Sequence, residues 1–368
     1  MREGEFLEHR MKRLLYYQRF LVRDRISLKS QFYPERVDIT DIDVLGIKFL
    51  DDLSPYTVIC ECKSGERAKS IDRLLWLKGL SQYLSVNSCY FVRKQFPSKV
   101  KEFAISLKIV PIDYSKIEDL EKQLCIADRW LGSHDYTFFC ERISRYYKNI
   151  CNNTDLLRIY WFLKSSFWYS SNVARVKKLM TALDQLTTNF DKMEDAIKDA
   201  IKWLFVETLI LLSVAVISLC SEIYPLNTDE REEYLKAKLI SDKLSPDEMR
   251  KIMQKVRSLT QAIVKERTGQ FIMLDDKLSE ITPPNFTDSL TEISERILEH
   301  PSISKEVPLF MDTFFYEFTL KNQKVETGFL EKFFSNLNMV AKMAKNVIKF
   351  ACAESNISNE LLKDLLSF

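Results

Sequence analysis

Two short stretches decide the fold of this chain: Thr40-Asp41-Ile42-Asp43-Val44-Leu45-Gly46 and, after a short spacer, Val58-Ile59-Cys60-Glu61-Cys62-Lys63-Ser64-Gly65. In each, charged side chains recur at every second position of an apolar run, which is the period of a β-strand. Because side chains alternate across a strand, Asp41 and Asp43 share one face, and Glu61 and Lys63 share one face of the next strand. The two strands together bring carboxylates and an amine to a common edge of a small sheet.

These groups suit the hydrolysis of a phosphodiester bond with the help of a metal ion. Hard cations such as Mg²⁺ usually need one or two carboxylates, water and a phosphate oxygen, and Asp43 and Glu61 would supply the carboxylates. A metal held there lowers the pKa of a bound water and offsets charge that develops on the phosphate. Lys63 would orient or deprotonate that water, or neutralise the phosphate, because burial and neighbouring charge set the pKa of an amine.

The pattern resembles the PD-(D/E)xK, or restriction-endonuclease-like, nuclease superfamily, in which Asp43, Glu61 and Lys63 match the catalytic positions. The resemblance covers roughly the first 125 residues. It implies an α/β domain with a mixed central sheet flanked by helices, in the order helix, three strands, helix, strand, helix, strand. One departure from the family pattern is that Thr40 and Ile42, in place of proline, precede the two aspartates.

The same resemblance implies further members of the site. The first helix of the family carries an acidic residue, which Glu8 matches in Gly4-Glu5-Phe6-Leu7-Glu8, with Glu5 as the alternative. The backbone carbonyl of Cys62 is expected to join Asp43 and Glu61 in holding the metal. Mg²⁺ is the expected cofactor, and Mn²⁺ is expected to substitute for it.

Apolar periodicity gives the elements of this first part. It predicts helices over residues 3–20, 70–84 and 98–107, and strands over residues 21–28, 37–49, 56–63, 88–93 and 109–114. Four cations follow the Glu61 strand and could grip the phosphates of a nucleic acid, namely Arg67, Lys69, Arg73 and Lys78. A solvated helix face is the alternative interpretation of this cluster.

Strand signals end near residue 130, and helical stretches follow to Phe368. We therefore expect a nuclease domain over residues 1–130 and an α-helical recognition or assembly domain over residues 131–368. Ser245-Pro246-Asp247-Glu248 has the composition of a helix start with a capping box, and prolines predict loops near 225–229 and 281–287. Aromatic residues between 146 and 169 are interleaved with Arg and Lys, and would form either a base-stacking surface or a helical core.

The apolar run from Trp203 to Cys220 has two interpretations. Its 18 residues reach the lower limit for crossing a bilayer. Against a membrane span, Glu207 would cost free energy in lipid, and no Lys- and Arg-rich flank or aromatic belt marks both ends. A helix that is apolar all round also suits the centre of a large bundle. We therefore predict a buried core helix, and a membrane is not an expected partner.

Composition excludes several other classes of protein. With 368 residues and a net charge of +2, the chain is long enough for two cores and has no strong charge bias. Eight cysteines and no signal-peptide layout favour a reducing cytoplasm with free thiols, and the scattered cysteines do not match a zinc site. Glycine-rich phosphate-binding motifs are missing, which argues against an ATPase or a dinucleotide enzyme. His9 points about 100° away from Glu8 on the first helix and is expected to be solvated.

The sequence thus predicts a Mg²⁺-dependent nuclease, most consistent with a DNA endonuclease of a restriction or phage-defence system. Its helical part would recognise substrate, form a homo-oligomer, or bind a partner ATPase. The alternative is a non-catalytic subunit that binds nucleic acid and assembles a multiprotein complex. Dependence on a metal ion separates these two hypotheses.

Overall fold

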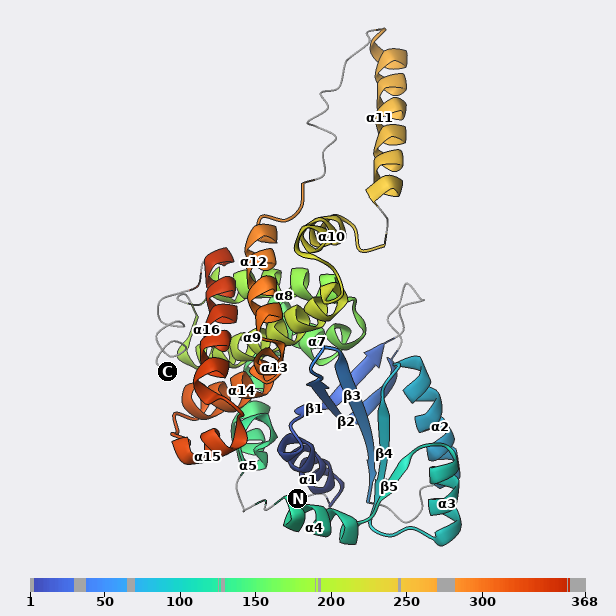
Figure 1. Cartoon of the computed structure of the whole chain (residues 1–368), viewed down its shortest axis with the longest axis vertical. Helices are drawn as coiled ribbons and strands as arrows, with labels where there is room; N and C mark the ends of the chain where they lie inside the picture. Colours follow the sequence, from blue (N-terminus) through green and yellow to red (C-terminus); the bar gives the residue numbers. More distant parts are fainter. Residues whose placement is uncertain are drawn as a thin grey trace.

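The computed structural model describes residues 3–29, 38–64, 70–124, 126, 130–188, 190, 193–243, 246–269, 282–355 and 357. In the N-terminal region a five-stranded mixed sheet is flanked by helices, and a mostly helical region follows it (Figure 1). This coarse architecture confirms the α/β and α-helical division that the sequence predicts. The proposed boundary between residues 130 and 131 stays a prediction, because the two regions share one hydrophobic core.

The sheet has the spatial order β1-β2-β3-β4-β5. Its first three strands form an antiparallel meander, and β4 and β5 then add in parallel to β3. The strands span Leu21–Lys29 (β1), Asp38–Phe49 (β2), Pro55–Lys63 (β3), Ser88–Arg93 (β4) and Val110–Ile112 (β5). These positions agree with the predicted strands to within a few residues at each end.

Helices cover both faces of the sheet. Figure 1 shows α2 and α3 on one face and α1 on the other. The buried side chains accordingly form two clusters: α2 and α3 pack on the face that includes Ile26, Ile42 and Ile59, whereas α1 joins Val22, Val44 and other residues to the helical region. The helices of this region are α1 (Glu3–Tyr17), α2 (Ser70–Tyr83), α3 (Ser98–Ser106) and α4 (Tyr114–Gln123).

Two details of this region differ from the sequence prediction. Helix α1 ends at Tyr17, three residues early, and Arg19 follows with a positive φ of 71° before β1 begins. Helix α4 was not predicted at all. Asp113 caps it by accepting a hydrogen bond from the Lys116 amide, and Ile117 is its buried residue. The capping aspartate was the signal that could have revealed this helix.

The helical region begins at residue 131 with short turns and continues with longer helices. Its short elements are η1 (Gly132–His134), α5 (Tyr136–Phe138), η2 (Phe139–Ile143), η3 (Ser166–Tyr169), α13 (Pro301–Ser304), η6 (Phe315–Leu320) and α15 (Thr327–Phe333). Its other helices are α6 (Ser144–Ile150), α7 (Thr154–Lys164), α8 (Asn172–Thr188), α9 (Asp195–Ile223), α10 (Thr228–Ile240), α11 (Pro246–Thr268), α12 (Thr287–Glu299), α14 (Val307–Phe314) and α16 (Leu337–Glu354).

Helix α9 is the central helix of this region and confirms the predicted core helix. It is long and apolar enough to cross a membrane, but 94% of its apolar window is buried inside the protein. Helices α6, α7, α8, α12, α14 and α16 all pack against it. The apolar surface that suggested a membrane is therefore covered by protein, as expected for the core helix of a bundle.

The predicted helix start and the two predicted loops of the helical region also agree with the structure. Helix α11 begins at Pro246, as predicted, and the proposed cap Ser245 lies outside the described residues. Residues 224–227 separate α9 from α10, and α12 begins at Thr287 after the Pro283-Pro284 pair. Both loops therefore lie where proline predicted them.

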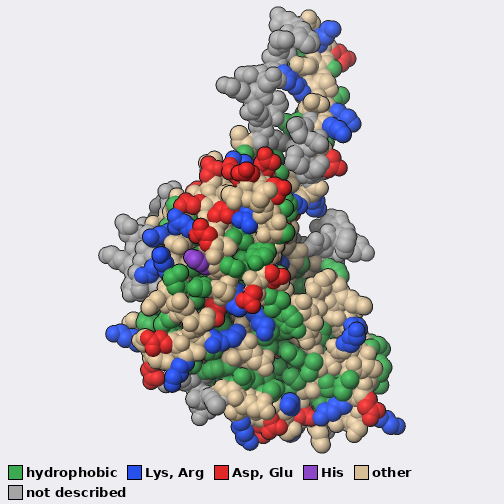
Figure 2. All heavy atoms as spheres, viewed as in Figure 1, with side chains coloured by type: hydrophobic (Ala, Val, Ile, Leu, Met, Phe, Trp, Pro, Cys, Tyr) green, Lys and Arg blue, Asp and Glu red, His purple; other side chains and the backbone are tan. Residues whose placement is uncertain are grey.

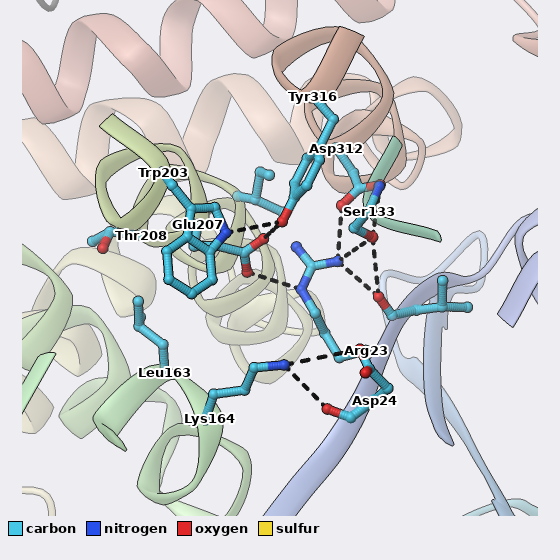
Figure 3. A network of polar contacts seen from close by, with 12 residues as sticks. Arg23, Asp24, Ser133, Leu163, Lys164, Trp203, Glu207, Thr208, Asp312 and Tyr316 are labelled. Atoms are coloured by element: carbon cyan, nitrogen blue, oxygen red, sulfur yellow. Dashed lines mark hydrogen bonds and ion pairs between the residues drawn. The ribbon is translucent and has the colours of Figure 1, made fainter. Parts of the chain in front are cut away.

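A buried polar network joins β1 to the helical region (Figure 3). Arg23 donates from Nε to Glu207 of α9 over 2.9 Å and from Nη1 to Asp312 of α14 over 2.8 Å. Ser133 completes this contact, because its hydroxyl accepts from Arg23 and donates to Asp312. Tyr316 donates to the other oxygen of Glu207. We call Arg23, Glu207, Asp312, Ser133 and Tyr316 the buried cluster.

Candidate active site

The register of the meander brings the predicted carboxylates together. Val44 of β2 and Cys60 of β3 are paired in the antiparallel ladder, and Asp43 and Glu61 are the next residues toward the same end of the sheet. Asp43 accepts a hydrogen bond from the Cys62 amide over 2.7 Å. This bond fixes the Asp43 carboxylate at the end of β3, next to the Glu61-Cys62-Lys63 motif.

Lys63 lies between the two carboxylates. Its Nζ is 3.1 Å from Asp43 Oδ2 and 2.9 Å from Glu61 Oε1. Burial by itself would lower the pKa of Lys63, but Asp43 and Glu61 outweigh it and raise that pKa. Burial and then the charge of Asp43 raise the pKa of Glu61, against the opposing effect of Lys63 and Arg73. We call Asp43, Glu61 and Lys63 the open cluster, since the Lys63 side chain keeps 27% of its surface exposed.

Helix α1 brings Glu8 to this end of the sheet. Burial, and then the negative charge of Asp43, raise the pKa of Glu8 to about 7. Its carboxylate is 3.5 Å from Arg25, and the same guanidinium lies 2.9 Å from the more exposed Glu5. Of the two acidic candidates on the helix, Glu8 is thus the less exposed one and the one whose pKa is raised by the charge of Asp43. Its assignment to the site remains a prediction.

Arg25 is a member of this site that the sequence did not suggest. Its neighbours Asp24 and Ile26 pair with Val44 and Ile42, so Arg25 lies opposite Asp43. Its φ of 51° is unusual for a residue with a side chain inside a strand. This strained conformation directs the guanidinium to α1, where it compensates the charge of Glu5 and Glu8. Nothing in a single sequence marks an arginine for a positive φ.

The predicted phosphate-binding cations separate into three groups. Arg73 on α2 belongs to the site, since its Nη1 is 3.7 Å from Glu61. Lys78 lies near Cys89, at the opposite end of β4 from the active-site end, so the structure does not bring it to the carboxylates. Arg67 and Lys69 lie outside the described residues. Arg93, which is not among the predicted cations, pairs in register with Lys63 and is buried.

The donor set is consistent with Mg²⁺, although it is small. Asp43 and Glu61 offer two carboxylates to one cation, which is within the usual protein contribution to a Mg²⁺ site. Within the described ranges, no three His, Cys, Asp or Glu side chains are close enough to hold one ion. Glu8 therefore does not complete a set of three carboxylates. The role of the Cys62 carbonyl stays a prediction.

His9 shows that the first helix is more deeply packed than expected. The prediction of a solvated histidine was wrong, because His9 is only 1% exposed and its ring lies 4.5 Å from Tyr136 and 5.2 Å from Phe139. Burial, and then the charge of Lys12, lower the pKa of His9 to about 3. The helical region supplies both aromatic rings and so covers this face of α1.

A basic cavity of about 720 Å³ lies between α7 and α8, where β1 ends. Trp161 and Phe162 supply aromatic surface, and no Asp or Glu is among the described residues that line it. Its cationic lining residues are Lys29, Arg158, Lys177 and Lys178. Lys29 lies four residues beyond Arg25 on β1, roughly 13 Å along the strand from the open cluster. The interleaved aromatic stretch thus contributes both to the core, through Phe167, and to this cavity.

Comparisons with protein-family models, curated proteins and solved structures give no match to this chain. The function must therefore be argued from the residues of the site.

Proposed function

We propose that this protein is a Mg²⁺-dependent nuclease with a restriction-endonuclease-like catalytic domain. The observation that carries the proposal is the open cluster, in which two carboxylates from adjacent strands lie 3.1 and 2.9 Å from one ammonium group. The order of elements also supports it, because α1, the β1-β2-β3 meander, α2, β4, α3 and β5 follow the order that the resemblance implies. The site is at the sheet end where α1 supplies an acidic residue.

Asp43 and Glu61 would hold the metal ion. Bound there, Mg²⁺ would supply Lewis-acid stabilisation of phosphate charge and lower the pKa of a water ligand. Asp43 is already oriented for this task by the Cys62 amide. The negative charges of Asp43 and Glu61 repel each other, which favours the binding of a cation between them.

Lys63 is proposed to act as a fixed positive charge and not as a base. Its raised pKa favours the ammonium form, which donates hydrogen bonds and offsets phosphate charge. Arg73 would add a second cation beside Glu61. Both side chains are partly exposed, so a substrate phosphate can approach them from solvent.

Glu8 is the proposed proton-transfer group. A pKa of about 7 means that this carboxyl gains and loses a proton near neutral pH, as general acid–base catalysis requires. Arg25 would hold it in place through the 3.5 Å ion pair. An unprotonated Glu8 could take the proton of the attacking water, and the protonated form could return it to the leaving oxygen.

Nucleic acid, with DNA favoured, is the proposed substrate. The cavity between α7 and α8 combines lysines for phosphates with Trp161 and Phe162 for stacking bases. It could hold a strand that extends from the cut site. The proposed restriction or phage-defence role rests on the resemblance of the nuclease domain, with the helical region as its recognition part.

The test is cleavage of labelled duplex DNA and single-stranded RNA by the full chain. We expect cleavage with Mg²⁺ or Mn²⁺ and none with a chelator. Glu61→Gln should lower the rate by about 100-fold or more, equivalent to about 2.7 kcal/mol. The matched control is Asp41→Asn, on the same sheet but exposed and outside the open cluster. Equal rates for wild type and Glu61→Gln, or cleavage in the chelator, would disprove the assignment.

The second candidate is a nucleic-acid-binding subunit without catalysis. The specific observation that favours it is the basic cavity, which could bind a strand whether or not the open cluster hydrolyses it. Binding of DNA without cleavage under every metal condition, together with loss of binding in Lys177→Glu, would support this function over the nuclease.

A further inference from the structure

Helix α11 is the part of the molecule that the proposed nuclease does not use. It spans Pro246–Thr268, which gives a length of about 34 Å for its 23 residues. Figure 1 shows α11 projecting beyond α10 and standing clear of the other labelled elements. None of the side chains that the structure describes in α11 belongs to either hydrophobic core.

The helix carries an exposed apolar stripe. Ile252, Val256, Leu259 and Ile263 are 43%, 50%, 62% and 53% exposed. Their spacings of four, three and four residues place them at alternating d and a positions of a heptad, on one face of the helix. The opposite face carries polar residues such as Gln254 and Ser258. In Figure 2 the same projection presents Lys and Arg side chains to solvent.

The exposed stripe of α11 is available to pack against a partner. Most helical stability in proteins comes from packing of an apolar face against other parts of the protein. Four large aliphatic side chains on one stripe also form an apolar surface of the kind that marks an interaction site.

We propose that α11 pairs with α11 of a second copy of this chain in a parallel two-stranded coiled coil. The residue types at the seam are the reason for choosing a second copy of the chain as the partner. Val256 and Ile263 are β-branched residues at a positions and Leu259 is leucine at a d position, which is the combination that favours parallel dimers. Ile252, at the other d position, departs from this preference without placing a polar group in the seam.

The chemistry of the helix argues against two other partners. A membrane-surface helix typically inserts Trp, Phe or Leu, and of these α11 has only Leu259. A nucleic acid would bind the basic face and leave the apolar stripe exposed. The helix has six Lys or Arg and three Asp or Glu, so two paired copies repel each other weakly. Salt should therefore strengthen the coiled coil, whereas it weakens binding to nucleic acid or anionic lipid.

A parallel pair places the two bodies at the same end of the coiled coil, because α10 precedes the N-terminal end of α11. The pairing itself does not rest on the proposed function. If the open cluster is a nuclease site, the pair supplies two sites on one side, which suits cleavage of both strands of a duplex.

The test is sedimentation equilibrium of the full chain. Wild type should be a dimer, and the double variant Val256→Lys, Leu259→Lys should raise the dissociation constant by at least about 100-fold, because it removes four apolar side chains from the seam of the dimer. The matched control Gln254→Lys, Ser258→Lys adds the same charge on the opposite face and should remain a dimer. Val256→Ile should also remain a dimer. Circular dichroism should show that all variants are folded, since α11 lies outside both cores.

Cross-linking tests the parallel orientation. Leu259→Cys should give a covalent dimer with oxidised glutathione as the oxidant, because identical d positions meet in a parallel pair. Ser258→Cys is the control and should give only the background of the native thiols. A monomeric wild type, a trimer, a dimer unaffected by the seam variant, or a wild-type monomer that binds anionic vesicles would each overturn the proposal.

Discussion

The open cluster and the buried cluster have the same charges in different surroundings. In each, one cation lies between two carboxylates: Lys63 between Asp43 and Glu61, and Arg23 between Glu207 and Asp312. The buried cluster adds hydrogen bonds from Ser133 and Tyr316, and its Arg23 side chain is 5% exposed. The Lys63 side chain is 27% exposed.

This difference separates a structural ion pair from a candidate reactive site. A planar guanidinium that is buried and already bound to two carboxylates is closed to a ligand from solvent. Burial by itself would lower the pKa of Arg23, but the charges of Glu207 and Asp312 outweigh it and leave that pKa well above its ordinary value. Arg23 therefore stays charged. The Lys63 ammonium at the sheet end is partly exposed and lies beside the half-buried Asp43 and the buried Glu61, so it can exchange partners with a metal ion or a phosphate that approaches from solvent. Charge pattern alone therefore does not mark a candidate site, and access from solvent is what distinguishes the two clusters.

The largest effect on stability is expected at the buried cluster. Arg23→Leu leaves Glu207 and Asp312 buried without their cation, and should lower the free energy of unfolding by about 3 to 5 kcal/mol. Urea denaturation followed by tryptophan fluorescence measures it.

Lys63→Leu is the matched variant of the open cluster. It should change the free energy of unfolding by about 1 kcal/mol or less, because Lys63 is partly solvated and Arg73 remains beside Glu61 as a second cation. It should also reduce nuclease activity. Equal destabilisation by the two variants would remove the distinction between the clusters.

The next largest effect on the free energy of unfolding is expected from a glycine that lies beside the buried cluster. Gly132 has a φ of 60°, and a Cβ there would lie 2.6 Å from Asp312 Oδ2. Gly132→Ala should therefore cost about 2 to 3 kcal/mol through backbone strain and displacement of that carboxylate. Thermal unfolding at neutral pH measures the loss.

Gly4→Ala is the control beside the open cluster. Its Cβ would lie 3.2 Å from Ser64 Oγ, a hydroxyl that can rotate, and alanine favours the helix. The free energy of unfolding should change by about 1 kcal/mol or less. A larger cost at Gly4 than at Gly132 would contradict the view that the open end of the sheet is the more adaptable one.

The smallest effect is a difference in pH dependence between neighbours on α1. The folded pKa of His9, about 3, is below its ordinary value of 6.5, so the unfolded chain binds the proton first and stability falls as pH drops from 6.5 toward 3. At pH 5 this amounts to about 2 kcal/mol. Glu8 has the opposite sign, because its raised pKa of about 7 adds stability as pH falls from 7 toward 4.5.

Unfolding free energies at pH 7 and pH 5 test this pair. His9→Gln should make the acid loss smaller by about 2 kcal/mol. Glu8→Gln should make it larger, since the opposing contribution disappears. The same acid loss in wild type and His9→Gln would show that the histidine is not buried against the helical region.

Much of the fold followed from local pattern. The strands from Leu21 to Arg93 and the core helix around Glu207 were predicted because period-two alternation and a continuous apolar run are each visible in the sequence. The end of α1 and the presence of α4 were not. Both depend on single residues, the left-handed Arg19 and the capping Asp113, whose effect is weaker than a repeated apolar pattern.

For the site, the sequence determined its chemistry, since Asp43, Glu61 and Lys63 lie on adjacent strands whose alternation places them at one sheet end. Tertiary structure alone decided which other groups join them. Arg25 joins the site from a position of β1 with a positive φ, and Arg73 joins it through the packing of α2. His9 is buried by rings that follow it by more than 120 residues in the sequence. The physical reason is that backbone alternation is local, whereas burial and charge compensation depend on which distant helices cover a surface. The sequence likewise determined the α11 stripe, but only the fold showed that nothing else in the described chain covers it.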